Sequence, residues 1–174
     1  MQYGFGVDIG GTTIKIGLFS VDGDLMEKWE IPTNKTDNGK YILTEIADFI
    51  NRTIEKKDIE KSDVMGVGLG VPGPVNKNGF VSVCVNLGWN SLNVEKEFHE
   101  ISGLPVKVGN DANVAALGEM WQGAGKGYQD VLMVTLGTGV GGGCVLNGQI
   151  VSGIHGAGGE IGHMPVRDDE KTPC

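Results

Sequence analysis

The sequence is poor in cysteine, in basic residues and in long apolar runs. Its three cysteines are odd in number and far apart, so they do not form the disulfide framework of a small secreted domain and suit a reducing cytoplasm. Lysine and arginine number 14 against 22 aspartate and glutamate, which gives a formal net charge of −8. This charge argues against non-specific binding to nucleic acid or to an anionic membrane, because phosphate binding needs clustered basic side chains.

Membrane-spanning and secretory segments are also missing from the sequence. No apolar run approaches the ~20 residues that a membrane helix needs. At the N-terminus, Asp8 and Lys15 interrupt what would be the uncharged apolar stretch of a secretory signal. We therefore expect a cytoplasmic protein that binds neither nucleic acid nor membrane.

Glycine is the residue that the sequence has in excess. Of the 174 residues, 30 are glycine and only 6 are proline, so glycine makes up roughly 17 % of the chain against an average of ~7 %. Without a collagen-like period, the excess indicates tight turns and close approach of the backbone to ligands. The length corresponds to one domain or one and a half, at the usual ~100–200 residues per domain.

The first part of the chain predicts a three-stranded antiparallel meander. Residues 3–9 and 12–20 alternate apolar with small or polar side chains, and residues 25–33 form a third strand after a turn at 21–24. The side chains that we expect to face a core are Tyr3, Phe5, Val7, Ile9, Ile14, Ile16 and Leu18.

A helix follows, with Asp37 or Asn38 as its cap and isoleucines at helical spacing up to Ile54. Residues 64–71 read as a buried parallel strand, and residues 76–79 suit a hairpin tip. The later elements are a helix at 93–102 ended by Gly103, a strand at 105–109, a helix from Asp111 to about Gln122, a strand at 131–136 and a hairpin at 144–151 that turns at Asn147-Gly148. This α/β order repeats its strand-rich opening, so we expect two closely coupled lobes with a junction near residues 109–123.

Two glycine-rich loops carry most of the functional information. Residues 8–15 read Asp-Ile-Gly-Gly-Thr-Thr-Ile-Lys, and residues 137–143 read Gly-Thr-Gly-Val-Gly-Gly-Gly. Glycines let backbone N–H groups approach phosphate oxygens, threonine hydroxyls add donors, and an adjacent aspartate can hold Mg²⁺.

Each of these loops alone could be an ordinary hairpin turn. The second matches G-x-G-x-x-G, but a dinucleotide fold needs a helix directly after it, and residues 144–151 are strand-like. The Walker A pattern is absent as well. Two such turns, each opening one lobe, favour a nucleotide held between paired lobes.

Four polar positions are candidates for chemistry. Asp111 follows Asn110 at a strand end and opens a helix, so it is either a simple N-cap or a base that accepts a hydroxyl proton, and the two roles are compatible. Glu160 and His163 lie in a third glycine-rich stretch, where they could bind a metal, hydrogen-bond a polyol or be ordinary loop residues. Cys174 could join His163 on zinc, although a closed site needs four ligands.

Taken together, the motifs resemble those of ROK-family sugar kinases. They are Asp8-Ile-Gly-Gly-Thr-x-x-Lys15, Gly70-Val-Pro-Gly73, Asn110-Asp111-Ala-Asn113, Gly137-Thr-Gly-Val-Gly-Gly-Gly143 and Gly159-Glu-x-Gly-His163, and Asn86-Leu-Gly-Trp89 is similar to the bacterial glucokinase branch. The resemblance covers essentially the whole chain. It implies an actin-like (RNase H-like) ATPase fold with a complete first lobe, residues 1–109, and a partial second lobe, residues 110–174.

The resemblance also implies ATP-dependent phosphorylation of a hexose, with Asp111 as the general base and Asp8 organising Mg²⁺. Gly73, Asn110, Asp111, Glu160 and His163 would bind the sugar, and His163 and Cys174 would belong to a structural Zn²⁺ site. The residues around the nucleotide would be Asp8, Gly10, Gly11, Thr12, Thr13, Lys15, Gly137, Thr138 and Gly139. Members of the family are usually homodimers.

The family pattern continues beyond Cys174, which is the position of the first of three zinc-binding cysteines. We therefore expect this chain to be the N-terminal portion of a kinase and not to be active alone. Glucose is the favoured sugar, but N-acetylglucosamine, N-acetylmannosamine, mannose and fructose kinases share these motifs. Two other functions stay open, the sugar-sensing module of a ROK-type transcriptional regulator and a structural actin-fold module. A strand that begins at Tyr3 leaves no room before it for a helix-turn-helix domain.

Overall fold

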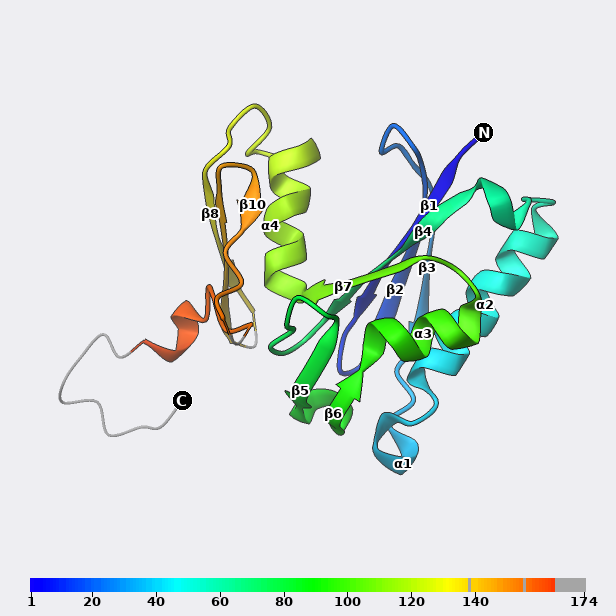
Figure 1. The fold of residues 1–174 in the computed structure, drawn as a ribbon, viewed down its shortest axis with the longest axis horizontal. Helices are drawn as coiled ribbons and strands as arrows, with labels where there is room; N and C mark the ends of the chain where they lie inside the picture. Colours follow the sequence, from blue (N-terminus) through cyan, green and yellow to red (C-terminus); the bar gives the residue numbers. More distant parts are fainter. Residues whose placement is uncertain (138, 155, 165–174) are drawn as a thin grey trace. The chain divides into compact units, whose positions relative to one another are not determined.

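The computed structural model describes residues 1–137, 139–154 and 156–164 (Figure 1). Two compact units divide the chain, one from Met1 to Asp111 and one that begins at Ala112. The first unit is built on a five-stranded sheet with the order β3-β2-β1-β4-β7, and the second on a three-stranded sheet with the order β10-β9-β8. In this part of the chain, no helix has the length and apolar character needed to cross a membrane.

The five-stranded sheet combines the predicted meander with two parallel strands. Strands β1 (Tyr3–Ile9), β2 (Thr13–Ser20) and β3 (Leu25–Pro32) pair antiparallel, whereas β4 (Val64–Val71) and β7 (Val106–Asn110) run parallel to β1. The predicted core faces of β1 and β2 are confirmed. Six of the seven expected side chains are buried and Tyr3 packs against the core half-buried.

Two helices, α2 (Ile42–Lys56) and α3 (Val94–Ser102), contribute to the same core as the sheet. Helix α3 is capped by the Asn93 side chain, which accepts from the Lys96 amide at 2.9 Å, and it ends at Gly103 as predicted. The predicted cap of α2 is wrong. Asp37 and Asn38 lie in the preceding short turn α1 (Thr36–Gly39), both with left-handed backbone, and α2 itself begins after Tyr41.

One hairpin was not predicted from the sequence. It is formed by β5 (Phe80–Cys84) and β6 (Trp89–Asn93), which are joined by the 3₁₀ turn η2 (Val85–Leu87). Its neighbour, the tip predicted at residues 76–79, is confirmed, because the Gly79 amide donates to the Asn76 carbonyl at 3.0 Å. The hydrophobic pattern of the residues after this tip does not indicate a strand. Val81 and Cys84 are both buried although they are three residues apart, which breaks the alternation of a half-buried strand.

The second unit repeats the strand meander. Helix α4 (Asp111–Gln122) leads to β8 (Val131–Leu136), β9 (Val140–Leu146) and β10 (Gln149–Ile150), and the 3₁₀ turn η3 (Ile161–His163) follows. The turn at Asn147-Gly148 is confirmed by positive φ at both residues, 51° and 73°.

The glycine loop predicted at residues 137–143 is too long, because β9 already begins at Val140. Close packing of β9 against its neighbours explains the later glycines. A Cβ on Gly143 would lie 2.6 Å from the Ala112 carbonyl oxygen and 2.7 Å from the Ala116 Cβ. Gly143 therefore allows α4 to approach the strand, Gly142 packs against Gly159 and Ile161, and neither forms a loop.

Replacing Gly143 with alanine should lower the free energy of unfolding by about 1–3 kcal/mol, because the new methyl group overpacks the contact with α4. The matched control is Gly118→Ala on α4, where no described atom lies within 4 Å of the added Cβ and where alanine should stabilise the helix by about 0.5–1 kcal/mol. Thermal unfolding followed by circular dichroism measures both variants. Equal effects of the two substitutions would contradict the packing assignment.

Candidate active site

The candidate site of the first unit lies where three parallel strands end. Asp8 on β1 is in register with Gly70 on β4, which is in register with Gly109 on β7, and Val71 pairs with Asn110. The segments that follow these strands therefore leave the sheet at one edge. In open α/β sheets, the carboxyl ends of parallel strands are where ligands bind.

The first segment at this edge is the turn between β1 and β2, residues 10–13. The Gly10 amide donates to the Thr13 carbonyl at 3.0 Å, and a Cβ on Gly10 would lie 2.7 Å from the same oxygen. Thr33 holds the turn from the end of β3. Its hydroxyl donates to the Gly10 carbonyl at 2.7 Å, and its amide donates to the Thr12 carbonyl at 2.9 Å. The turn is thus fixed before any ligand binds.

Asp8 and Lys15 flank this turn as directly paired residues of β1 and β2. Both are exposed, as is Thr12 within the turn. The predicted phosphate-binding residues of the first unit are therefore contiguous. They place a carboxylate, an ammonium and a hydroxyl around one glycine turn.

The second segment, Pro72-Gly73-Pro74, follows β4. Gly73 has φ of 144°, and a Cβ there would lie 3.0 Å from the Val83 carbonyl oxygen, so the loop backbone lies against β5. The Asn110 side chain is buried and donates through Nδ2 to the Gly73 carbonyl at 3.2 Å. Two predicted sugar-binding residues from different strands are thereby brought together.

Asp111 follows Asn110 as the first residue of α4 and is exposed. Its Cα would lie 3.7 Å from a Cβ on Gly70, so it is close to the end of β4 as well as β7. The charge of Asp111 acts on the thiol of Cys84. Burial raises the pKa of the Cys84 thiol, and the negative charge of Asp111 raises it further. A carboxylate thus lies at a helix N-terminus, where the helix dipole favours its ionised form.

The second unit contains the other predicted residues that the structure describes. Gly137 and Gly139 form the turn between β8 and β9, in which the Gly137 amide donates to the Gly139 carbonyl at 2.9 Å. Glu160 and His163 lie at η3, with 3.8 Å between Oε2 and Nε2. A Cβ on Gly162 would lie 2.1 Å from the Val140 carbonyl oxygen, so the segment around η3 lies against the start of β9.

Thr138 and Cys174 lie outside the described residues. Within residues 1–137, 139–154 and 156–164, no group of three or more His, Cys, Asp and Glu side chains could hold a metal ion. The zinc site therefore stays a prediction. The same is true of the expectation that both glycine turns face one cleft between the lobes.

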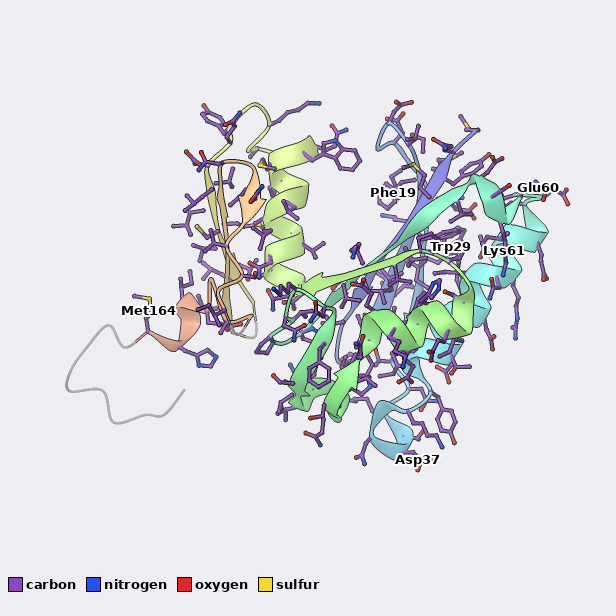
Figure 2. The ribbon with its side chains drawn as sticks, in the orientation of Figure 1. Phe19, Trp29, Asp37, Glu60, Lys61 and Met164 are labelled. Atoms are coloured by element: carbon purple, nitrogen blue, oxygen red, sulfur yellow. The ribbon has the colours of Figure 1, made fainter. Side chains whose placement is uncertain are left out.

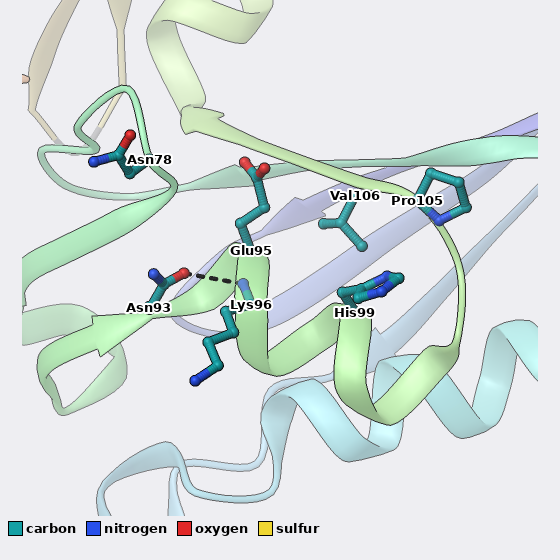
Figure 3. A pocket seen from close by; sticks show the side chains of 7 residues that line it. All are labelled: Asn78, Asn93, Glu95, Lys96, His99, Pro105 and Val106. Carbon is teal, nitrogen blue, oxygen red and sulfur yellow. Dashed lines mark hydrogen bonds between the residues drawn. The ribbon is translucent and has the colours of Figure 1, made fainter.

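A cavity of about 370 Å³ lies elsewhere in the first unit (Figure 3). Its lining is polar apart from two side chains, and it comprises Asn78, Asn93, Glu95, Lys96, His99, Pro105 and Val106. The Glu95 carboxylate is already paired with Lys107 at 2.9 Å. None of the predicted site residues lines this cavity, so it is not the site that the motifs describe.

Two supporting residues were not predicted, Thr33 and Cys84. The hairpin register contains a signal for Thr33, because Pro32 pairs with Thr13, so the next residue along β3 comes opposite Thr12. Cys84 had no such signal, since it lies at the end of a strand that was not predicted. Its Sγ donates to the Pro72 carbonyl at 2.6 Å, next to the Gly73 loop.

Known proteins with similar sequences and structures include sugar kinases and transcriptional regulators. The profile of the ROK family matches residues 4–174. A glucokinase from Halalkalibacterium halodurans is 49% identical over 170 residues, which are 97% of this chain and 52% of that protein. An N-acetyl-D-glucosamine kinase from Haemophilus influenzae is 38% identical over 93% of this chain and 52% of its own length. The chain thus spans about half the length of the curated relatives it matches.

Among solved structures, a ROK family glucokinase from Streptomyces griseus, in complex with glucose and AMPPNP, has a TM-score of 0.79 and 35% identity to this chain. The match covers 97% of this chain and 52% of that one. The likeness confirms the expected actin-like ATPase fold.

Replacing Thr33 with valine should lower the free energy of unfolding by about 1 kcal/mol, because the Gly10 carbonyl loses its hydroxyl donor while the side-chain shape is kept. Thr33→Ser keeps the donor and should stay near wild type. Urea unfolding measures both variants, with Thr44→Val on the exposed side of α2 as the matched control. If Thr33→Val is as stable as that control, the hydroxyl does not hold the turn.

The raised pKa of Cys84 predicts a dependence of stability on pH. The unfolded chain loses the thiol proton near its ordinary pKa of ~8.5, before the folded chain does. The contribution to stability is therefore fully present below that pH and is lost as the pH rises towards the folded pKa. From pH 8 to 10, urea unfolding should show a steeper loss of stability for wild type than for Cys84→Ala. Parallel curves would show that the thiol is not perturbed.

Proposed function

This chain belongs to the ROK family, and from that membership we propose that it acts in the ATP-dependent phosphorylation of a hexose, with glucose 6-phosphate as the product. The observation that carries the proposal is the convergence, at one edge of the sheet, of the turn at residues 10–13, the Gly73 loop and Asn110-Asp111. These three segments supply phosphate donors, sugar contacts and a carboxylate. Phosphoryl transfer asks for positioning and charge neutralisation of this kind, with little covalent chemistry by the protein.

Asp111 is proposed as the general base. Its carboxylate would take the proton of the sugar hydroxyl as that oxygen bonds to the γ-phosphorus of ATP, and ADP leaves with the electrons of the broken P–O bond. The position at the start of α4 supports this role, because the helix N-terminus favours the ionised carboxylate by about 0.3–1 kcal/mol. Exposure of the side chain leaves it accessible to a substrate.

The hexose would be held by Asn110 and the Gly73 loop in the first unit and by Glu160 and His163 in the second. The hydrogen bond from Asn110 to the Gly73 carbonyl supports this assignment, since it fixes the amide group and the loop relative to each other. Amide and carboxylate groups are suitable partners for the hydroxyls of a sugar.

The nucleotide phosphates would lie against the turn at residues 10–13 and, in the second unit, against residues 137–139. Magnesium neutralises phosphate charge when it is bound. Asp8 and Lys15, which lie beside the turn as a directly paired set, would bind the metal and the phosphates. Zinc bound by His163 and Cys174 is proposed from the family pattern alone.

The composition of the chain and the usual properties of the family also support proposals about localisation, partners and assembly. The net charge of −8 and the scattered cysteines support a cytoplasmic enzyme of carbohydrate metabolism that binds neither nucleic acid nor membrane. A homodimer is the expected assembly. An N-acetylhexosamine is the second candidate substrate, because a relative with 38% identity is an N-acetyl-D-glucosamine kinase.

The test is a coupled assay of ADP release with glucose, N-acetylglucosamine, N-acetylmannosamine, mannose and fructose, using the full-length protein. Asp111→Asn should lower kcat by about 10²–10⁴-fold, because the base is lost while the size of the side chain is kept. The KM for the hexose should change by no more than a few fold. The control is Asp48→Asn, an exposed aspartate on α2.

Normal turnover by Asp111→Asn would remove the assignment of the base. An absence of ADP release by wild type with all five sugars would instead contradict the proposed function itself.

A further inference from the structure

The segment that joins β5 to β6 contacts both parts of the proposed site in the first unit. We define this bridging segment as residues 84–89, Cys-Val-Asn-Leu-Gly-Trp. None of the roles assigned so far uses it, except that Cys84 adjoins the Gly73 loop. Val85 and Asn86 are exposed, whereas Cys84, Leu87 and Trp89 are buried. Its exposed part is thus held in place by three anchored residues.

The first end of the bridging segment is attached to the Gly73 loop, residues 72–74, which we call the hexose loop. The Cys84 thiol donates to the Pro72 carbonyl at 2.6 Å, and the carbonyl of the preceding Val83 would lie 3.0 Å from a Cβ on Gly73. Cys84 is only 2% exposed, so packing around the thiol holds this end in place. A shift of Cys84 would therefore move the backbone that the Asn110 side chain binds.

The middle of the segment lies next to the turn at residues 10–13, which we call the phosphate turn. A Cβ on Gly11 would lie 3.5 Å from the Asn86 carbonyl oxygen and 3.6 Å from the Asn86 Cβ, which is van der Waals contact. Asn86 thus adjoins Gly11, whereas Thr33 bonds to Gly10 and Thr12 of the same turn. Leu87, which is fully buried, fixes the backbone directly after Asn86.

The far end is attached to the α1 turn. The Trp89 indole Nε1–H donates to the Gly39 carbonyl at 3.1 Å in a buried position. A Cβ on Gly39 would lie 2.3 Å from the Leu87 carbonyl oxygen, so the two backbones are in close contact. Asp37, labelled in Figure 2, and Asn38 precede this contact with φ of 51° and 58°. Such backbone is kept only where surrounding contacts hold it.

We propose that the bridging segment, anchored by Cys84 and Trp89, is a positioning element that fixes the phosphate turn relative to the hexose loop. The inference rests on the proposed function, because its consequence is alignment of the acceptor hydroxyl with the γ-phosphate. Neither anchor needs to touch a substrate. A small misplacement of either half of the site lowers the rate of transfer, since the reaction depends on in-line geometry.

The first test uses Trp89→Phe, which keeps an aromatic ring but removes the N–H that binds Gly39. The matched control is Trp29→Phe in the same unit, where Trp29 packs edge-to-face on Phe49 at 5.5 Å between ring centroids. Hydrogen exchange followed by mass spectrometry reads out the effect without any need for activity. In Trp89→Phe, peptides that cover residues 10–13 and 72–76 should exchange roughly tenfold faster, because a buried acceptor has lost its donor.

Trp29→Phe should leave those two peptides within about twofold of wild type and act on β3 and α2, with which Trp29 packs. Faster exchange at both sites in both variants would show general loosening and overturn the proposal. Unchanged exchange at residues 10–13 and 72–76 in Trp89→Phe would overturn it as well.

Kinetics of the full-length protein provide the second readout, at a temperature where circular dichroism shows both variants folded. Trp89→Phe should lower kcat by roughly tenfold with smaller changes in both KM values, whereas Trp29→Phe should keep kcat within about twofold. If Trp89→Phe does not fold, Cys84→Ala serves in its place and Cys84→Ser, which restores a donor to Pro72, should recover most of the rate. A wild type without kinase activity contradicts the proposed function, whereas an active wild type with unaffected variants contradicts only this inference.

Discussion

The parallel pairing of β1, β4 and β7 is the constraint on which the rest of the site depends. Its register places the ends of the three strands at one edge, so three segments distant in the sequence become neighbours. A one-residue slip of a strand would turn its core side chains to the other face. The buried faces of these strands, among them Phe5, Leu69 and Val106, therefore fix the register and with it the site.

Around this edge, the contacts that shape the site come from residues that need not touch a ligand. Thr33 fixes the turn at residues 10–13 from the end of β3, and Asn110 fixes the Gly73 loop from β7. Cys84 and Trp89 tie the segment between these two parts to the rest of the unit. The geometry is therefore built into the first unit by hydrogen bonds to backbone carbonyls.

The sequence was sufficient for the elements with a clear period. The alternation of β1 and β2 and the spacing of α2 identified their buried faces, and Asn147-Gly148 identified a hairpin turn. It was insufficient where tertiary contact decided the structure. Gly143 is in a strand because α4 packs there, and Asp37 and Asn38 form a strained turn held by Trp89 instead of a helix cap. The motifs located Asn110 and Gly73 separately, but only the strand register shows that they meet.

Backbone NMR of the protein, titrated with glucose and with a non-hydrolysable ATP analogue, tests the central claim most directly. The claim is that this edge of the sheet binds both substrates. Glucose should shift the amide resonances of Gly73, Asn110 and Asp111, and the nucleotide should shift those of residues 10–13. Shifts confined to the cavity lined by Glu95 and His99, or no shifts at saturating ligand, would contradict it.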